Sequence, residues 1–171
     1  MRARTTLLLC LLFLIAGCIS VKKFGAYWDS GKPDPTLEGR WDSVRADKGG
    51  AGVSFGADGD IYRMRFDHDT DDQFVRTLAV GESTYLMVKK KEGDEGGTMI
   101  AYVQQGEDLV LFAPNRDKQK DFLKKYPTIP FVITKTSFTI EELTPETMKW
   151  LIQISSEPEW WIAMQSFKRA Q

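Results

Sequence analysis

Cysteine, histidine and long apolar runs are scarce in this chain, and each scarcity excludes a class of protein. The 171 residues include two cysteines and one histidine, too few for a disulfide scaffold or a cysteine-rich zinc site. The longest apolar segment, Leu7 to Ile19, has about 13 residues, whereas a membrane-spanning helix needs ~20. The sequence contains no Walker loop, dinucleotide fingerprint, CxxC or HExxH, which excludes the common nucleotide-binding and metalloprotease motifs.

An excess of positive charge is also missing. The chain has 23 basic and 24 acidic residues, and its net charge is −1 at pH 7. Removing residues 1–17, which carry two arginines and no acid, leaves about 154 residues with a net charge of about −3. That balance gives no electrostatic footprint for nucleic acid, and the length suits one domain with its own core.

The N-terminal segment has the parts of an export signal. Two arginines precede the apolar run, and two small residues end it before a cysteine. Ile15-Ala16-Gly17-Cys18 resembles the lipobox of bacterial lipoproteins. The resemblance implies that signal peptide 1–17 is cleaved between Gly17 and Cys18. It also implies diacylglycerol on the Cys18 thiol and a fatty acyl chain such as palmitate on its new amino group. Ordinary secretory cleavage is the alternative, and the short run disfavours a permanent membrane span.

The resemblance also implies a location. A lipoprotein with Ile19 rather than aspartate after the cysteine is expected, in a Gram-negative cell, at the outer membrane facing the periplasm. We therefore expect a membrane-anchored protein of the cell envelope, held durably because each buried CH₂ contributes ~0.8 kcal/mol. Residues 18–36 contain glycine and proline and lack periodicity, so they predict a lipidated tether before a single domain over 37–171.

Short alternating runs predict that residues 37–113 are mostly β-strand. Hairpin signals stand between the runs at Asp58-Gly59, Gly81-Glu82 and Gly106-Glu107. Strands at this spacing predict an antiparallel meander that forms a small barrel or half-barrel. The expected strands are 37–44, 52–56, 60–66, 73–80, 83–89, 98–105 and 108–113.

Helices enter in the last third, so the expected fold class is β-rich α+β with C-terminal helices. Asn115 can cap the first helix, and Thr144-Pro145 is typical of a second helix start. Ser156-Glu157-Pro158-Glu159 resembles a capping box and predicts a third helix. The expected helices lie near 115–126, 145–155 and 157–167, with a β-like run at 131–143 between the first two.

Gly39-Arg40-Trp41, at the start of the first expected strand, resembles the G-x-W signature of lipocalins. In that family the tryptophan plugs the closed end of an eight-stranded barrel, so the resemblance implies a lipocalin-like barrel with Trp41 at one end. The order of elements departs from the family, because a helix is expected after the seventh strand. The pattern is also similar to small bacterial lipoproteins of unassigned function.

Arg63 and Arg65 share one face of the expected strand 60–66. With Trp41 they are the candidate residues for binding a ligand or anion in a β cavity. The alternative is that this arginine face is exposed to water, as one face of an antiparallel sheet often is.

The acidic turn DHDTDD holds the single histidine, His68. Asp67, Asp69 and Asp71 have the spacing that starts a calcium loop, but Asp72 and Leu78 stand where glycine and glutamate are needed. We therefore expect a solvated turn and no metal site. No nucleophile–base or acid–base pair can be placed across a cleft, so no catalytic residue is expected.

These patterns together favour a non-enzymatic, lipid-anchored envelope protein that binds a small apolar or amphipathic ligand in a β cavity. The alternative is a structural or accessory subunit of an envelope protein complex, with a filled core. The expected partners are the membrane, through the anchor, and a small ligand or an envelope protein. Apart from the acyl groups on Cys18, no cofactor is expected.

Overall fold

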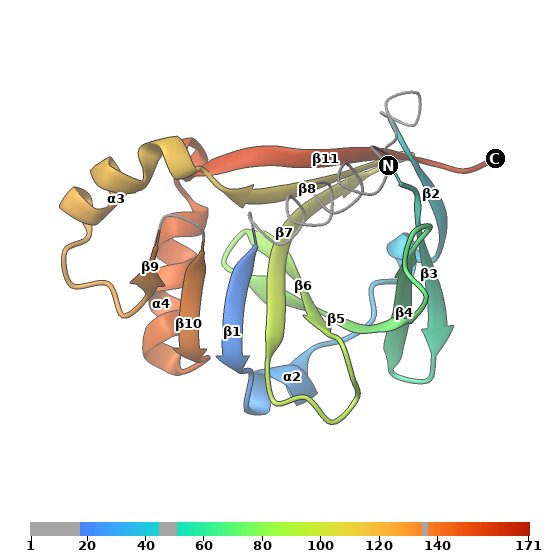
Figure 1. Ribbon diagram of the computed structural model, residues 1–171, viewed down its shortest axis with the longest axis horizontal. Helices are drawn as coiled ribbons and strands as arrows, with labels where there is room; N and C mark the ends of the chain where they lie inside the picture. The colour runs from blue at the N-terminus through green and yellow to red at the C-terminus, as the bar shows by residue number, and fades with distance from the viewer. Residues whose placement is uncertain (1–17, 45–50, 135–136) are drawn as a thin grey trace, which may run out of the picture.

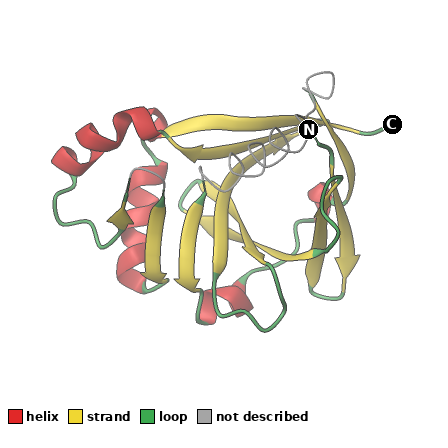
Figure 2. Ribbon diagram, viewed as in Figure 1, coloured by secondary structure: helices red, strands yellow, loops and turns green. Residues whose placement is uncertain are grey.

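The computed structural model describes residues 18–44, 51–134 and 137–171, so the expected signal peptide 1–17 lies outside the described residues. Its strands form one sheet that closes on itself, and the longer helices gather at one end of the molecule (Figures 1 and 2).

Eight strands make a closed barrel. Each strand pairs antiparallel with the next in the chain, and the last one pairs with both β8 and β2. The predicted antiparallel meander is confirmed, and it forms a closed barrel rather than a half-barrel. The strands are β2 (Gly39–Ser43), β3 (Val53–Asp58), β4 (Ile61–Phe66), β5 (Gln73–Val80), β6 (Ser83–Lys89), β7 (Gly97–Gln105), β8 (Asp108–Pro114) and β11 (Trp161–Arg169).

The barrel strands follow the alternation in the sequence. In β4, Tyr62, Met64 and Phe66 are buried while Arg63 and Arg65 are exposed, because successive side chains point to opposite faces. The three expected hairpin turns are present, and each turn glycine has a positive φ, as at Gly59 (65°) and Gly81 (62°). Glycine adopts this conformation without the steric cost of a Cβ.

A second, smaller set of strands extends from β7. β1 (Ile19–Lys23) pairs with the start of β7 and, in parallel, with β10 (Phe138–Glu142), which pairs with β9 (Val132–Ile133). The end of β7 pairs with β8 instead, so β7 belongs to both layers. Gly97 allows this crowding, since a Cβ there would lie 1.9 Å from the carbonyl oxygen of Val88 in β6.

The predicted helices near 115–126 and 145–155 are present. Asn115 caps the first turn by accepting a hydrogen bond from the amide of Asp117 (3.2 Å). Thr144 and Thr147 form a reciprocal capping box at the start of α4. The helical elements are α2 (Ala26–Ser30), η1 (Pro35–Leu37), η3 (Arg116–Lys118), α3 (Gln119–Lys125), α4 (Pro145–Ser155) and η4 (Pro158–Trp160), where η marks a 3₁₀-helix.

Two apolar clusters hold the fold together. The inner cluster fills the barrel, and the outer cluster lies between the barrel wall and the layer of β1, β10, α3 and α4. β6 contributes to both, since Leu86 and Val88 point inward while Tyr85 and Met87 point outward. The inner cluster consists of Leu37, Trp41, Val53, Phe55, Tyr62, Met64, Phe66, Val75, Leu86, Val88, Ile100, Tyr102, Leu109, Leu111 and Phe167.

Residues 19–36, expected as a tether, are instead part of the fold. Ile19 and Val21 are each 1% exposed and pair with Met99 and Gly97 of β7. Phe24 is fully buried and stacks on Trp28, with 5.7 Å between ring centroids. The prediction was wrong because glycine and proline suggested a linker, whereas the short alternation in ISVKK was the signal of a paired strand.

The helix predicted over 157–167 is also wrong. Only Pro158–Trp160 is helical, as the single turn η4, and Trp161–Arg169 forms β11. β11 fills the gap between β8 and β2, so it removes two open strand edges that would otherwise be exposed. This long-range pairing outweighs the local helix-start signal at Ser156–Glu159.

Candidate functional site

Trp41 is fully buried in the inner cluster and lies near one end of the barrel strands, since it pairs with Val53, the first residue of β3, and Arg169, the last residue of β11. Its Nε1 donates a hydrogen bond of 2.7 Å to the carbonyl oxygen of Leu37 in η1. The guanidinium of Arg169, from β11, lies 4.3 Å from the centre of the Trp41 ring and donates to the carbonyl oxygens of Glu38 (2.7 Å) and Thr36. Trp41 therefore contributes to packing at this end of the barrel.

The barrel interior is occupied by side chains. Every member of the inner cluster is at most 8% exposed, and the cluster includes six aromatic rings. Interiors packed in this way leave little room for a ligand. The cavity expected inside the β structure must therefore be sought on its outer wall.

Arg63 and Arg65 lie on that outer wall but not beside Trp41. Arg63 pairs with Asp58 (2.6 Å) and lies 5.2 Å from the ring of Phe74, while Arg65 pairs with Asp72 (2.8 Å). Both arginine side chains are about half exposed. The three sequence-predicted ligand residues thus lie on opposite sides of the barrel wall and do not line one site.

The acidic turn is engaged in local contacts. Asp67 binds Arg40 (2.8 Å) and the amide of Gly52, and the Arg40 hydrogen bonds lower the pKa of the Asp67 carboxyl. Asp69 accepts a hydrogen bond from Gln73 (3.1 Å), and His68 stacks on Phe66. Within residues 18–44, 51–134 and 137–171, no three acidic, histidine or cysteine side chains converge as metal ligands would.

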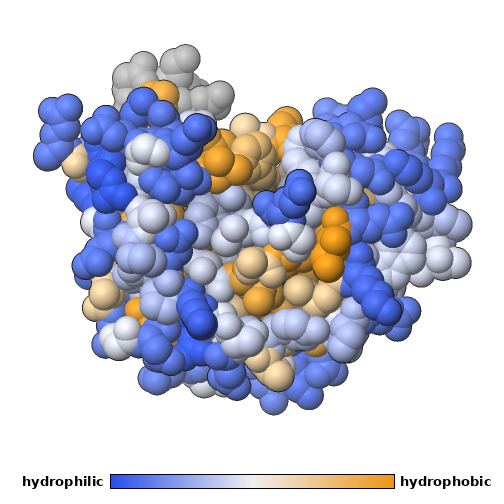
Figure 3. Space-filling model, turned by 180° about the vertical axis from the view of Figure 1, so that it is seen from behind, coloured by the Kyte–Doolittle hydropathy of each residue, from blue (hydrophilic) through white to orange (hydrophobic). Residues whose placement is uncertain are grey.

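A groove of about 520 Å³ lies where the β6–β7 pairing ends. The last pair is Thr84 with Tyr102, and β7 continues to Gln105, so its final residues have β8 on one side and the groove on the other. The turn between β5 and β6 and the end of α4 form the other walls. Figure 3 shows apolar side chains gathered around a hollow near the centre of this face.

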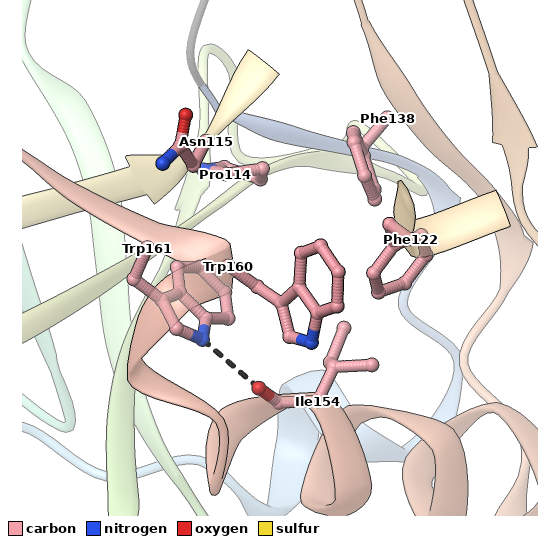
Figure 4. Close-up of a pocket in the computed structure, with 7 residues that line it drawn as sticks. All are labelled: Pro114, Asn115, Phe122, Phe138, Ile154, Trp160 and Trp161. Atoms are coloured by element: carbon pink, nitrogen blue, oxygen red, sulfur yellow. Dashed lines mark hydrogen bonds between the residues drawn. The ribbon is translucent and has the colours of Figure 1, made fainter. Parts of the chain in front are cut away.

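One wall of the groove is apolar. Val103 of β7 is 53% exposed, an unusual position for a valine, and Phe112 and Trp161 stand beside it from β8 and β11. Trp161 is held in place by its Nε1, which donates to the carbonyl oxygen of Ile154 (3.1 Å; Figure 4). Its ring also makes an edge-on contact with Tyr85. The wall is therefore rigid as well as apolar.

The other end of the groove is polar. Tyr102 belongs to the inner cluster and is 5% exposed, but it also borders the groove. Its hydroxyl donates a hydrogen bond of 2.6 Å to Asp34, which also accepts from the amide (3.0 Å) and hydroxyl (2.7 Å) of Thr36. Burial opposes ionisation of Asp34, but these hydrogen bonds outweigh it and lower the pKa of its carboxyl. Burial and the bond to Asp34 raise the pKa of Tyr102 well above its usual value. At neutral pH the pair is therefore a carboxylate bound to a neutral phenol.

A smaller cavity lies behind Trp161, between η4 and the aromatic residues of the outer cluster (Figure 4). It is lined by Phe122, Phe138, Ile154 and Trp160 and measures about 10 Å³, which is the space of a single water molecule at most. It is a packing gap between rings rather than a ligand site.

Cys18, the residue expected to carry lipid, stands at the start of β1. It borders a second small pocket of about 10 Å³ with Arg116, Gln119 and Ser137. Burial raises the pKa of the Cys18 thiol to about 11, although the nearby Arg116 charge opposes this. As a free thiol it would be protonated at neutral pH, which does not suit a catalytic nucleophile.

Comparison with protein families, curated proteins and solved structures finds no match to this chain. In the parts of the chain that the structure describes, no helix has both the length and the apolar character needed to cross a bilayer.

Sequence reasoning missed the groove and its residues. Val103 stood in an alternating strand like its neighbours, and Asp34 lay in the expected tether. The available signal was the unequal length of neighbouring strands. β7 extends beyond its last pair with β6, so one side of its final residues has no neighbouring strand.

Proposed function

We propose that this protein is a non-enzymatic, lipid-anchored component of a bacterial cell envelope that binds a small amphipathic molecule in the groove on the outer barrel wall. The anchor rests on Ile15-Ala16-Gly17-Cys18 and its flanks, and in a Gram-negative cell it would hold the protein at the outer membrane. The groove supports the binding role.

The observation that carries the binding proposal is the amphipathic lining of the groove. Its volume of about 520 Å³ lies in the range of small-molecule sites, ~300–1,000 Å³. Val103, Phe112 and Trp161 offer an apolar wall for a hydrocarbon chain, and Asp34 with Tyr102 offers a polar end. A ligand with a short apolar tail and a head that hydrogen-bonds fits both parts.

The groove chemistry favours binding over catalysis. Its titratable pair has pKa values pushed far apart, with Asp34 ionised and Tyr102 neutral, so the phenol is a poor nucleophile and the carboxylate a weak base. Glu82, the other acid at the groove, is exposed on the β5–β6 turn.

A thermal-shift experiment tests the binding role. The probe is decanol, whose hydroxyl can donate a hydrogen bond to a carboxylate, added below its solubility limit to the purified protein. Binding to the folded state raises Tm by mass action. Val103→Glu places a charge in the apolar wall and should abolish the rise, whereas Val132→Glu, at an equally exposed valine on β9, should keep it. An unchanged Tm of the parent protein, or an equal rise in both variants, contradicts the proposal.

The filled barrel favours a second candidate, an accessory subunit of an envelope protein complex. A packed inner cluster makes the barrel a rigid scaffold, and the exposed Val103 would then contact a protein. This role predicts no Tm gain with decanol. It predicts instead that a photo-crosslinker at position 103, but not one at position 132, captures one defined envelope protein in cells.

A further inference from the structure

No flexible linker separates Cys18 from the folded domain. Ile19, the next residue, is 1% exposed and pairs with Met99 on one side and Phe138 on the other. One extended residue spans ~3.5 Å. Acyl chains on Cys18 would therefore bring the surface around this residue against the lipid headgroups, and the chemistry of that surface matters.

The helical segment η3–α3 borders Cys18. Arg116 and Gln119 from this segment line the same small pocket as Cys18, and Gln119 donates to the carbonyl oxygen of Thr134 (3.0 Å). The segment is anchored beneath by Phe122, which is 1% exposed and packs on Trp160 and Phe138. Its outer face is therefore fixed relative to the lipidation position.

That outer face is cationic with one apolar residue in it. Arg116, Lys120 and Lys124 are spaced four apart, and Leu123 lies between the last two, so all four share one side of the helix. All four are exposed, Leu123 by 39%. We call Arg116, Lys120, Leu123 and Lys124 the basic face.

Two acids lie beside the basic face. Asp117 and Asp121 stand three residues before Lys120 and Lys124, so they neighbour these lysines on the helix surface, on the side away from Gln119 and the Cys18 pocket. Lys125 is turned toward Glu157 and pairs with it (2.5 Å). The segment 116–125 has five basic and two acidic residues, so it keeps an excess of positive charge, although the whole chain has a net charge of −1.

Some cations on other surfaces of the molecule form ion pairs with neighbouring acids. Lys22 pairs with Glu141 (2.8 Å) and Lys168 with Asp108 (2.8 Å). Among the residues that the structure describes, no ion pair is found for Lys120 or Lys124. These two charges are available to an external anionic partner.

We propose that the basic face docks on an anionic phospholipid surface and fixes the orientation of the anchored domain. The inference rests on the lipid anchor at Cys18 proposed above. Each lysine close to such a surface strengthens attraction about fivefold, and Leu123 can enter the headgroup boundary. The domain would then lie with the side that carries Cys18 and η3–α3 toward the bilayer.

A fluorescence experiment on the lipidated full-length product tests the docking. An introduced cysteine would be the one free thiol of the mature protein, since Cys10 leaves with the signal peptide and Cys18 carries lipid. An environment-sensitive dye is placed at Leu123→Cys or, as a control, at Ala57→Cys in β3. The protein is bound to vesicles of phosphatidylcholine with or without phosphatidylglycerol, and the vesicles are floated before measurement.

The expected result is a blue shift and quenching by lipid-borne quencher at position 123 in anionic vesicles, with neither at position 57. Lys120→Glu with Lys124→Glu should abolish the signal, whereas Lys90→Glu with Lys91→Glu, in the exposed β6–β7 loop, should not. If the protein floats but the dye at 123 stays in water, the docking is overturned and the anchor stands. If it does not float with neutral vesicles, the anchor is overturned, and the docking with it.

Discussion

The side chain of Arg169 connects β11 with Trp41 of β2 and with the backbone of Thr36 and Glu38. Its guanidinium covers the Trp41 ring and donates to the carbonyls of Thr36 and Glu38, which lie more than 130 residues earlier in the chain. Arg169→Ala should lower the free energy of unfolding by about 2–3 kcal/mol, the sum expected for a cation–π contact and charged hydrogen bonds.

Urea unfolding of Arg169→Ala measures this loss. Arg169→Lys should recover only part of the stability, since an ammonium cannot reach both carbonyls in the geometry of a guanidinium. Lys168→Ala is the matched control on the exposed face of β11 and should unfold like the parent. Equal stabilities of the two alanine variants would contradict this role for Arg169.

Glu157 makes stability depend on pH. Burial opposes its ionisation, but hydrogen bonds from Lys125, Tyr126 and Trp160 outweigh this and lower the pKa of the carboxyl from its ordinary value of 4.5. A group with a lowered folded pKa stabilises the fold above its unfolded pKa and loses that contribution as pH falls through the folded pKa. Glu157→Gln should therefore destabilise the protein at pH 7 by about 1–2 kcal/mol.

The Glu157→Gln effect should begin to shrink as the pH falls below about 4.5 and should be lost below the folded pKa of Glu157, where both proteins carry a neutral side chain. The measurement is the free energy of unfolding at neutral and acidic pH. Glu159→Gln, an exposed neighbour of the same charge, is the control and should leave the pH profile unchanged. A difference in the free energy of unfolding between the parent and Glu157→Gln that stays constant across this pH range would contradict the role of Glu157 in the pH dependence.

Residues that act locally could be predicted from the sequence, and residues that act across the chain could not. The period-two alternation placed Arg63 and Arg65 on one outward face, and the hairpin signals were correct. The contacts of Arg169 and the Asp34–Tyr102 pair join segments 68 or more residues apart. Nothing within a few residues of these positions encodes such partners.

At the scale of elements, α4 was predictable because its capping residues and apolar positions lie within one short segment. β11 was not, because a capping pattern precedes it and its strand character comes from pairing with β8 and β2. β1 was missed although ISVKK alternates, because five residues are a weak signal beside the glycines and prolines that follow, and the partners β7 and β10 lie about 80 and 120 residues away.

The integration of β1 into the fold predicts a stability effect in a segment expected as a tether. Val21→Ala should cost about 2 kcal/mol, because Val21 is 1% exposed and truncation leaves a cavity. Ser20→Ala, its exposed neighbour, should have no measurable effect. Calorimetric or urea unfolding of the two variants distinguishes a strand from a tether, for which neither substitution would matter.

At the scale of the whole molecule, the two apolar clusters predict that stability is not uniform. Phe122 belongs to the outer cluster and is ringed by Tyr126, Phe138 and Trp160 at centroid distances of 5.0 to 5.5 Å. Phe122→Ala should cost about 3–5 kcal/mol and should loosen the layer of α3, β9 and β10 before the barrel, because that layer contributes little to the inner cluster.

Hydrogen exchange resolves these two parts. Amides of α3, β9 and β10 should exchange faster in Phe122→Ala, while those of β3 and β4 keep their protection. Leu123→Ala, at the exposed neighbour, should leave both sets unchanged. A uniform loss of protection across β3, β4 and α3 would mean that the two clusters unfold as one.

The start of β1 directly after Cys18 limits how the anchored protein would search for its ligand or partner. A domain on a long flexible linker can move through a large volume above the bilayer. This domain would instead stay close to the headgroups. Its encounters would depend on lateral diffusion in two dimensions, and molecules that never approach the membrane would not meet it. Inserting a flexible glycine–serine spacer between Cys18 and Ile19 would let the domain reach molecules farther from the membrane.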